Sequence, residues 1–251
     1  MLTVTECFDE TRVKKRKVEE LVLSIESENP FIFPLSFFTC DSLVVLDLKY
    51  NSILCLPNTI SFPRIKILRL TNIEFVNENL TGELFSNCPI LEGLCLFDCD
   101  FVDDFKVLCI TSGTLKHLSI INCCLFHQTL KVFTPNLLTI KYAAELPADF
   151  VLGRFLSLVE ADIQISNNRA QPRLYAPIIK LYQRLFNVKL LKTSGSSFQC
   201  LTAANILLAN LSTFCNLVCL EVSSAFCSWM GPHASFVFVY EDIFVVSPTL
   251  A

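Results

Sequence analysis

The residues of this chain that could do thiol or metal chemistry gather in two places. Cys123, Cys124 and His127 form a short cluster of the ligand types that bind zinc. Cys95 and His117 offer a second combination, because a histidine can activate a nearby cysteine as a nucleophile. A zinc site needs about four ligands in spaced pairs, and a nucleophile needs an orienting acid and an oxyanion-binding turn. The neighbouring sequence supplies neither, so we predict no metal, no cofactor and no enzymatic activity.

Most of these residues stand inside a repeated leucine pattern. The stretch ILEGLCLFDC (residues 90–99) places Leu91, Leu94, Leu96 and Cys99 at positions 1, 4, 6 and 9 of the block L-x-x-L-x-L-x-x-N/C. In a leucine-rich repeat this block forms a short strand that lines one side of a curved solenoid. The cysteines are therefore interpreted first as strand residues.

The block recurs in phase along most of the chain. Nine copies can be placed, with first positions at Val18, Leu43, Ile65, Leu91, Leu115, Leu137, Leu158, Val188 and Leu217. Their spacing of 21 to 30 residues is close to the length of a leucine-rich repeat. After Val222 the register is lost. We predict an N-terminal basic edge (1–17), a domain of about nine repeats (18–226) and a divergent C-terminal cap or truncated end (227–251).

The pattern predicts an α/β fold, a leucine-rich-repeat solenoid or horseshoe. A parallel sheet should line its concave face, with short helices or extended segments on the convex face. Residues 79–87 and 177–186 carry apolar side chains at helical spacing, so each predicts a convex helix. Residues 60–63 favour an extended outer segment.

Position 9 predicts a structural ladder where the strands end. The backbone turns away there and leaves polar groups that need partners. Asn51, Cys99 and Cys123 occupy this position in their blocks. An amide can donate and accept hydrogen bonds, and a thiol can pack there as a weak donor.

The side chains between the leucines predict a partner surface on the concave face, because successive strand residues point to opposite sides. Phe97 and Ile121 should form an adjacent apolar pair rimmed by charges, as protein contacts often do. Ordinary surface variation, or cover by the C-terminal segment, would explain the pair equally well. The candidate surface comprises Asp47, Lys49, Arg69, Thr71, Cys95, Phe97, His117, Ser119, Ile121 and Lys141.

Composition limits the class of protein. Hydrophobic residues make up 52% of the 251, and the net charge of −4 argues against nucleic acid as a partner. The start shows no secretory signal, and no apolar run reaches the roughly 20 residues of a membrane span. The 13 cysteines are odd in number, which favours reduced thiols. We expect no membrane partner and an intracellular protein of the cytoplasm, the nucleus or both. The basic run at 12–17 fits either a solvated edge or a nuclear-import signal.

Three phrases resemble the repeats of the plant F-box/LRR/FBD proteins. They are FFTCDSLVVLDL (37–48), FSNCPILEGLCL (85–96) and TFCNLVCLEV (213–222), and the similarity covers approximately residues 18–222. The resemblance implies a role in ubiquitin ligation, in which an N-terminal F-box docks on the cullin ligase's adaptor and the repeats hold the substrate. Neither an F-box before Val18 nor an FBD after Val222 is recognisable.

The combined prediction is a non-catalytic protein-interaction module, similar to the substrate-recognition repeats of an SCF-type ubiquitin ligase. Its partner would be an unidentified protein substrate on the concave face. Without an F-box, we expect no docking on the cullin-ligase adaptor. Two alternatives stay open: a partial or degenerate member of the F-box family, and a stand-alone repeat scaffold.

Overall fold

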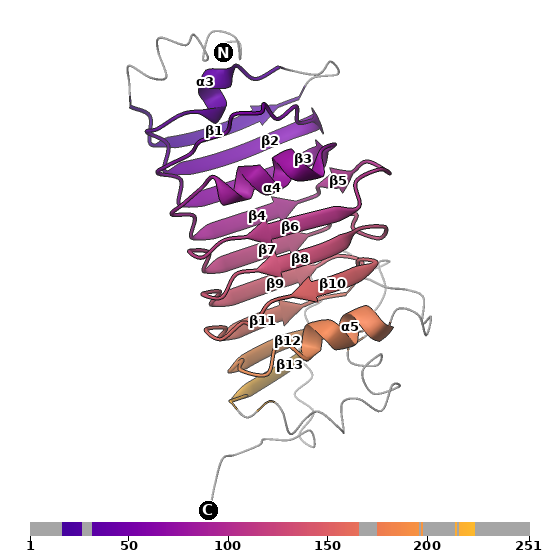
Figure 1. Cartoon of the computed structure of the whole chain (residues 1–251). Helices are drawn as coiled ribbons and strands as arrows, with labels where there is room; N and C mark the ends of the chain where they lie inside the picture. Colours follow the sequence, from indigo (N-terminus) through magenta and orange to yellow (C-terminus); the bar gives the residue numbers. More distant parts are fainter. Residues whose placement is uncertain are drawn as a thin grey trace, which may run out of the picture.

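The described part of the chain folds into two layers, a large sheet of parallel strands and a second layer of helices and a smaller parallel sheet. The structure, a computed structural model, describes residues 17–26, 32–165, 175–195, 197, 214 and 216–223. The larger layer, here called the main sheet, follows the order β1 (Glu20–Ile25), β2 (Val45–Ile53), β3 (Ile67–Phe75), β4 (Gly93–Phe97), β7 (His117–Ile121), β9 (Thr139–Ala143), β11 (Glu160–Ile163), β12 (Leu190–Ser194) and β13 (Cys219–Ser223). The short β5 (Asp100–Phe101) pairs with the end of β3. Figure 1 shows these strands stacked like rungs along the molecule.

Each strand of the main sheet coincides with the central part of one of the nine predicted blocks. Position 4 is in register from strand to strand, so Leu46 lies beside Leu68, Leu68 beside Leu94 and Leu94 beside Leu118. These leucines are no more than 2% exposed, whereas their sequence neighbours on the strands are partly or fully exposed. Alternation with a period of two is what a sheet with one buried face requires. The predicted leucine-rich-repeat solenoid is confirmed.

A line of backbone hydrogen bonds begins just before the strands. At position 2, Lys66 N–H donates to Val44 O, Glu92 N–H to Lys66 O and Lys116 N–H to Glu92 O, each at 2.8 Å. The series continues along the sheet to Val218 N–H, which donates to Lys189 O at 2.8 Å. Neighbouring repeats are thus tied together before the strands proper start.

The second layer contains helices where the sequence predicts them. The helix α4 (Glu78–Ser86) lies at the predicted 79–87 segment and begins at Asn77, whose side-chain oxygen accepts from Leu80 N–H at 3.0 Å. Leu84 and Phe85 face the core. The helix α5 (Tyr175–Tyr182) covers the first part of the predicted 177–186 segment. A single helical turn, α3 (Leu35–Phe38), lies near the start of the main sheet, and residues 56–62 have no regular structure.

Between α4 and α5 the second layer is a small sheet that the leucine pattern did not predict. This outer sheet follows the order β10 (Asp149–Leu152), β8 (Thr129–Phe133) and β6 (Val107–Thr111), all parallel. Figure 1 shows it in front of the main sheet, continuing the layer that α4 begins. Because α4 contacts β6 and α5 contacts β10, helices adjoin both edges of the outer sheet. At the β10 edge Lys180 pairs with Asp149 at 2.6 Å.

The core fills the space between the two layers without interruption. Aromatic rings are prominent in it: Phe75 stacks on Phe101 with ring centroids 5.6 Å apart, and Phe101 packs on Phe105 at 4.9 Å. Such pairs add to the burial of apolar area. No helix within the described ranges is both long enough and apolar enough to cross a membrane. The predicted C-terminal segment (227–251) and nearly all of the basic edge (1–17) lie outside the described residues.

Candidate functional site

The predicted partner surface forms one continuous patch. It lies on the side of the main sheet that faces away from the core, here called the open face, which carries repeat positions 3, 5 and 7. The position-5 residues of the predicted surface stand side by side in register, and they are Asp47, Arg69, Cys95, Ser119 and Lys141. The predicted position-7 residues form a second row, with Lys49, Thr71, Phe97 and Ile121 in register. The structure therefore brings together residues that lie up to 94 positions apart in the chain.

Ion pairs mark the N-terminal part of the open face. Arg69 on β3 approaches Asp47 on β2, with Nη1 and Oδ2 3.7 Å apart. Lys49 pairs with Glu26 at 3.8 Å. All four side chains are substantially exposed, so each pair contributes at most about 1 kcal/mol to stability. Their main effect is to set a pattern of charge.

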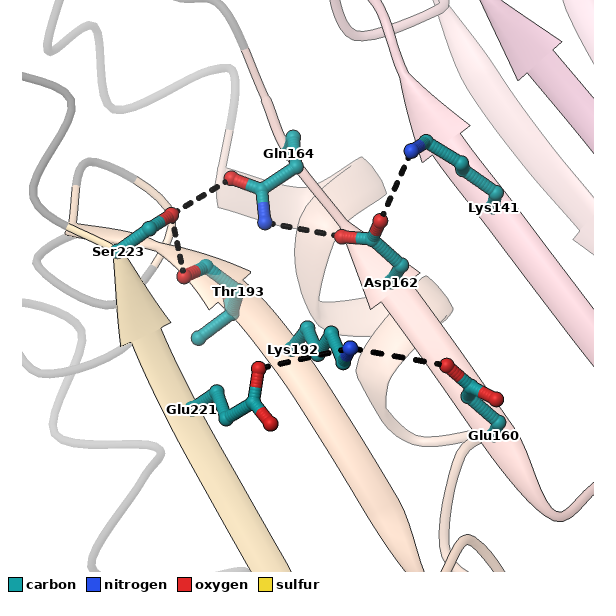
Figure 2. Close-up of polar contacts among 8 residues, drawn as sticks. All are labelled: Lys141, Glu160, Asp162, Gln164, Lys192, Thr193, Glu221 and Ser223. Atoms are coloured by element: carbon teal, nitrogen blue, oxygen red, sulfur yellow. Dashed lines mark hydrogen bonds and ion pairs between the residues drawn. The ribbon is translucent and has the colours of Figure 1, made fainter. Parts of the chain in front are cut away.

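The C-terminal part of the open face carries a polar network that extends beyond the predicted surface. Figure 2 shows Lys141 Nζ reaching Asp162 on β11, 3.3 Å from Oδ2. Gln164 Nε2 donates to the other oxygen of Asp162 at 2.9 Å. Ser223 on β13 then donates to Gln164 Oε1 at 3.0 Å and lies 3.3 Å from the carbonyl oxygen of Thr193.

Lys192 on β12 extends this charge pattern at position 5. Its Nζ lies 3.6 Å from Glu221 and 4.0 Å from Glu160, as Figure 2 shows. The signal for these residues is present in the sequence. Position 5 alternates in charge over the last strands, and in register this gives the cross-strand pairs Lys141–Asp162 and Lys192–Glu221. Glu160, at repeat position 3 on β11, supplies the second partner of Lys192.

The centre of the open face carries no acidic or basic side chain other than a histidine. Phe97 and Ile121 are adjacent in register, but both are half-buried, so they lie low in the face. Cys95 and Ser119 are half-buried as well. The exposed His117 has its Nδ1 2.9 Å from Thr139 Oγ1 on β9. The apolar pair is thus a shallow floor between charged flanks.

The surroundings of Cys95 do not favour a nucleophile. Burial raises the pKa of the Cys95 thiol, against the opposing effects of the Arg69 and Lys141 cations. A raised pKa reduces the thiolate fraction that a nucleophile needs. His117 makes its hydrogen bond to Thr139. These features argue for Cys95 as part of a surface and against a cysteine–histidine pair.

The cysteine and histidine cluster follows the end of β7, and its members differ in burial. The Cys123 side chain is buried and its Sγ lies 3.4 Å from Ile121 O, whereas Cys124 and His127 are exposed. A hydrogen bond to the Asp100 carboxylate, together with partial burial, raises the pKa of Cys124 to about 11. Within the part of the chain that the structure describes, no group of three or more histidine, cysteine or carboxylate side chains could hold a metal ion.

Position 9 behaves differently in different repeats. Cys99 and Cys123 are buried in adjacent repeats, and a hydrogen bond between the two thiols, with burial, raises the pKa of Cys123. Asn51 is exposed instead. The register of β2 against β3 shifts between Lys49 and Ser52, so Ser52 takes the place beside Ile73 that regular spacing would give to Asn51. An extra residue in β2 thus moves Asn51 out of the predicted ladder and to the surface.

The residue before position 9 adopts a left-handed backbone in three successive repeats. Asn72, Asp98 and Asn122 have φ values of 54°, 50° and 53°. Asparagine and aspartate tolerate this conformation better than other non-glycine residues. A shallow hollow of about 320 Å³ opens beside these turns, and it is lined by Asn51, Ser52, Asn72, Ile73, Glu74, Asp98 and Asp100.

A side-chain ladder does exist, but at the other end of the strands. The residue before position 1 donates to the backbone of the preceding repeat in four places: Ser42 to Val18 O at 2.8 Å, Thr114 to Leu91 O at 2.9 Å, Asn136 to Gly113 O at 2.7 Å and Asn187 to Leu156 O at 2.7 Å. Sequence reasoning overlooked this position because serine, threonine and asparagine share no single residue pattern. Their shared property is a short side chain with a hydrogen-bond donor.

Comparisons with known proteins agree with the repeat architecture. Residues 11–149 match the family model described as "FBD-associated F-box protein At5g56370, LRR repeats". Among Arabidopsis thaliana relatives, the FBD-associated F-box protein At5g38590 is 39% identical over 42% of this chain and 25% of its own length. The F-box/FBD/LRR-repeat protein At1g78750 is 32% identical over 66% of this chain and 37% of its own length.

The F-box/LRR-repeat protein At4g14096, also from Arabidopsis thaliana, is 29% identical over 76% of this chain and 42% of its own length. The chain therefore spans less than half the length of these curated relatives. No solved structure matches the chain. Since the family model covers more than half of the sequence, the chain belongs to the leucine-rich-repeat family of the FBD-associated F-box proteins.

Proposed function

We propose that this chain is a non-catalytic module that binds a protein partner on its open face, as the substrate-recognition repeats of an SCF-type ubiquitin ligase would. The observation that carries the proposal is the patch itself. Positions 4 and 6 are occupied almost throughout by buried apolar residues, whereas position 5 changes from Asp47 to Arg69, Cys95, Ser119 and Lys141 along the same strands. Variable chemistry on a regular frame suits recognition.

The chemistry of the face supports binding in preference to catalysis. The pKa of Cys95 is raised, and His117 has Thr139 as its hydrogen-bond partner. The relatives are named as F-box proteins, which is the basis for proposing a place in ubiquitin ligation. An intracellular location, in the cytoplasm or the nucleus, is part of the same proposal.

Exchanging the two charges of one ion pair tests whether the open face is the binding surface. The double variant Asp47→Arg/Arg69→Asp keeps a cross-strand pair between β2 and β3 but reverses its direction. Tagged wild type and variant are each expressed in plant cells, and captured proteins are quantified by mass spectrometry. We expect proteins that the wild type enriches to be lost from the swap variant, because the charges meet the partner in the wrong order.

The control variant is Lys131→Glu, which reverses a charge on β8 of the outer sheet. It should capture the same proteins as wild type, and circular dichroism should be unchanged in both variants. Equal capture by wild type and by the folded swap variant would count against the open face as the binding surface.

The connection to the ligase is tested with the purified cullin adaptor. We expect residues 1–251 alone not to retain the adaptor, because substrate binding and adaptor docking belong to different segments in this proposal. Retention at micromolar concentration would show that this chain itself contains a docking element. Ubiquitylation of a captured protein that depends on the open face would distinguish a ligase role from a stand-alone scaffold.

A further inference from the structure

Two cations flank the centre of the open face. At position 5, Arg69 on β3 and Lys141 on β9 are separated by Cys95 on β4 and Ser119 on β7, here called the central gap. Each cation has its carboxylate partner on the outer side: Asp47 lies on β2, and Asp162 lies on β11. The row thus reads acid, base, two uncharged residues, base, acid.

The fields of both cations overlap in the gap. Neighbouring strands are about 4.8 Å apart, so the backbones of Arg69 and Lys141 are about 14 Å apart across three strand spacings. Both side chains are long. Burial of the Cys95 thiol between them and the nearby Asp47 carboxylate raise the pKa of that thiol, whereas both cations lower it. Along the position-5 row the two cations are thus the charged residues nearest the gap, and each carboxylate partner lies one strand farther out.

We propose that the central gap binds one carboxylate of a partner peptide, an aspartate or glutamate side chain, between Arg69 and Lys141. The inference rests on the proposed function of the open face. Apolar side chains beside that acid would contact Phe97 and Ile121, which lie on the same two central strands. The Ser119 hydroxyl can donate a further hydrogen bond to the carboxylate.

The charge balance selects this ligand over others. Each cation is already paired with one carboxylate at 3.3 to 3.7 Å, so the remaining attraction suits a single negative charge. A nucleic-acid backbone would place phosphates over Asp47 and Asp162 as well, which like charges oppose. A basic peptide would be repelled by the two cations that flank the gap.

A random-peptide display library supplies the probe. Peptides selected on the full chain are sequenced, and one enriched peptide is synthesised together with its Glu→Gln or Asp→Asn version. We expect the enriched sequences to share one acidic residue with apolar neighbours. Loss of the acid should weaken binding about tenfold, because two exposed ion pairs are removed together.

A double-mutant cycle then locates the acid. In the Arg69→Gln/Lys141→Gln variant the peptide should bind about tenfold more weakly, and neutralising its acid should cause little further loss. The matched control is Lys192→Gln. It removes the position-5 cation that pairs with Glu160 and Glu221 and lies outside the central gap. This control should bind the peptide like wild type.

The alternative outcomes separate the two proposals. The carboxylate site is overturned if the selected peptides depend on Phe97 and Ile121 (tested as Phe97→Ser/Ile121→Ser) but not on Arg69 and Lys141. In that case the open face still stands as the binding surface. Selection of peptides without a shared acid would also overturn the site. If no selected peptide depends on any open-face residue, both proposals fail.

Discussion

The two sides of the main-sheet strands are built under different constraints. On β4 the buried side consists of Leu94 and Leu96, while the open side carries Gly93, Cys95 and Phe97. The neighbouring β7 repeats the buried pair as Leu118 and Ile120 but replaces every open-side residue. The difference shows that packing keeps apolar residues at the buried positions of both strands, whereas the open side is free to vary. Fold and recognition can therefore be changed separately.

Adjacent residues on β7 provide the strongest test of this comparison. Leu118 is 1% exposed, so Leu118→Ala should lower the free energy of unfolding by about 2–5 kcal/mol through lost burial and a cavity. Ser119→Ala, one residue along the strand on the open side, should change it by no more than about 0.5 kcal/mol. Chemical unfolding of both variants gives the comparison. Similar losses for the two would show that the sides are not independent.

The turn after the same strand should give the next largest effect. Asn122 has a left-handed backbone, so Asn122→Val should cost about 1–2 kcal/mol because a β-branched side chain fits this conformation poorly. Asn122→Gly is the matched control and should be nearly neutral. Thermal unfolding measures both. If valine and glycine behave alike, the left-handed backbone is not what requires asparagine here.

Sequence reasoning located the buried side well and the strand ends poorly. The spacing of Leu91, Leu94 and Leu96 determines which residues face inward, so the strands and the register of the open face followed from it. Asn51 was misplaced because one extra residue in β2 changes the turn without changing the leucine spacing. The hydrogen-bond ladder lies before position 1, where several residue types serve equally well.

The outer layer was predicted only where helices form. The α4 segment has apolar residues at helical spacing and an asparagine cap, which a sequence shows directly. The strand β6 has an alternating pattern with Leu108 and Ile110 buried, but a strand of five residues resembles many irregular segments. Pairing with β8, which lies one repeat later in the chain and itself pairs with β10, is what makes it a strand.

A buried hydroxyl on the core side offers a smaller effect of opposite sign. Thr134 is 1% exposed, and its Oγ1 has no hydrogen-bond partner among the described residues. In an earlier repeat the equivalent residue, which also precedes a proline, is Cys88. Its Sγ, unlike the Thr134 hydroxyl, has a partner among the described residues: it donates a hydrogen bond to Leu84 O at 3.2 Å. Thr134→Val should raise stability by about 1 kcal/mol, because the unpaired hydroxyl is replaced by a methyl group of similar size.

Calorimetry of Thr134→Val beside Thr134→Ser checks this prediction. The serine variant keeps the hydroxyl and loses a methyl group, so it should be less stable than wild type. A valine variant that is destabilised would mean that the hydroxyl has a role in the fold.

The smallest effect on stability is expected at an exposed charge of the open face. Arg69→Gln breaks the 3.7 Å pair with Asp47, but both side chains are accessible to water. The free energy of unfolding should change by less than about 0.5 kcal/mol, and less again at high salt. A loss above about 1 kcal/mol, measured by chemical unfolding, would give Arg69 a structural role and weaken the separation of the two sides.

The most direct measurement combines stability and binding in one preparation of the Asp47→Arg/Arg69→Asp variant. Chemical unfolding should give a free energy within about 0.5 kcal/mol of wild type, since the exposed pair is preserved in reverse. Capture of the wild-type partners from plant cells, measured on the same sample, should be lost. Undiminished capture by this stable variant would contradict the account that the open face is the surface on which this chain binds its partners.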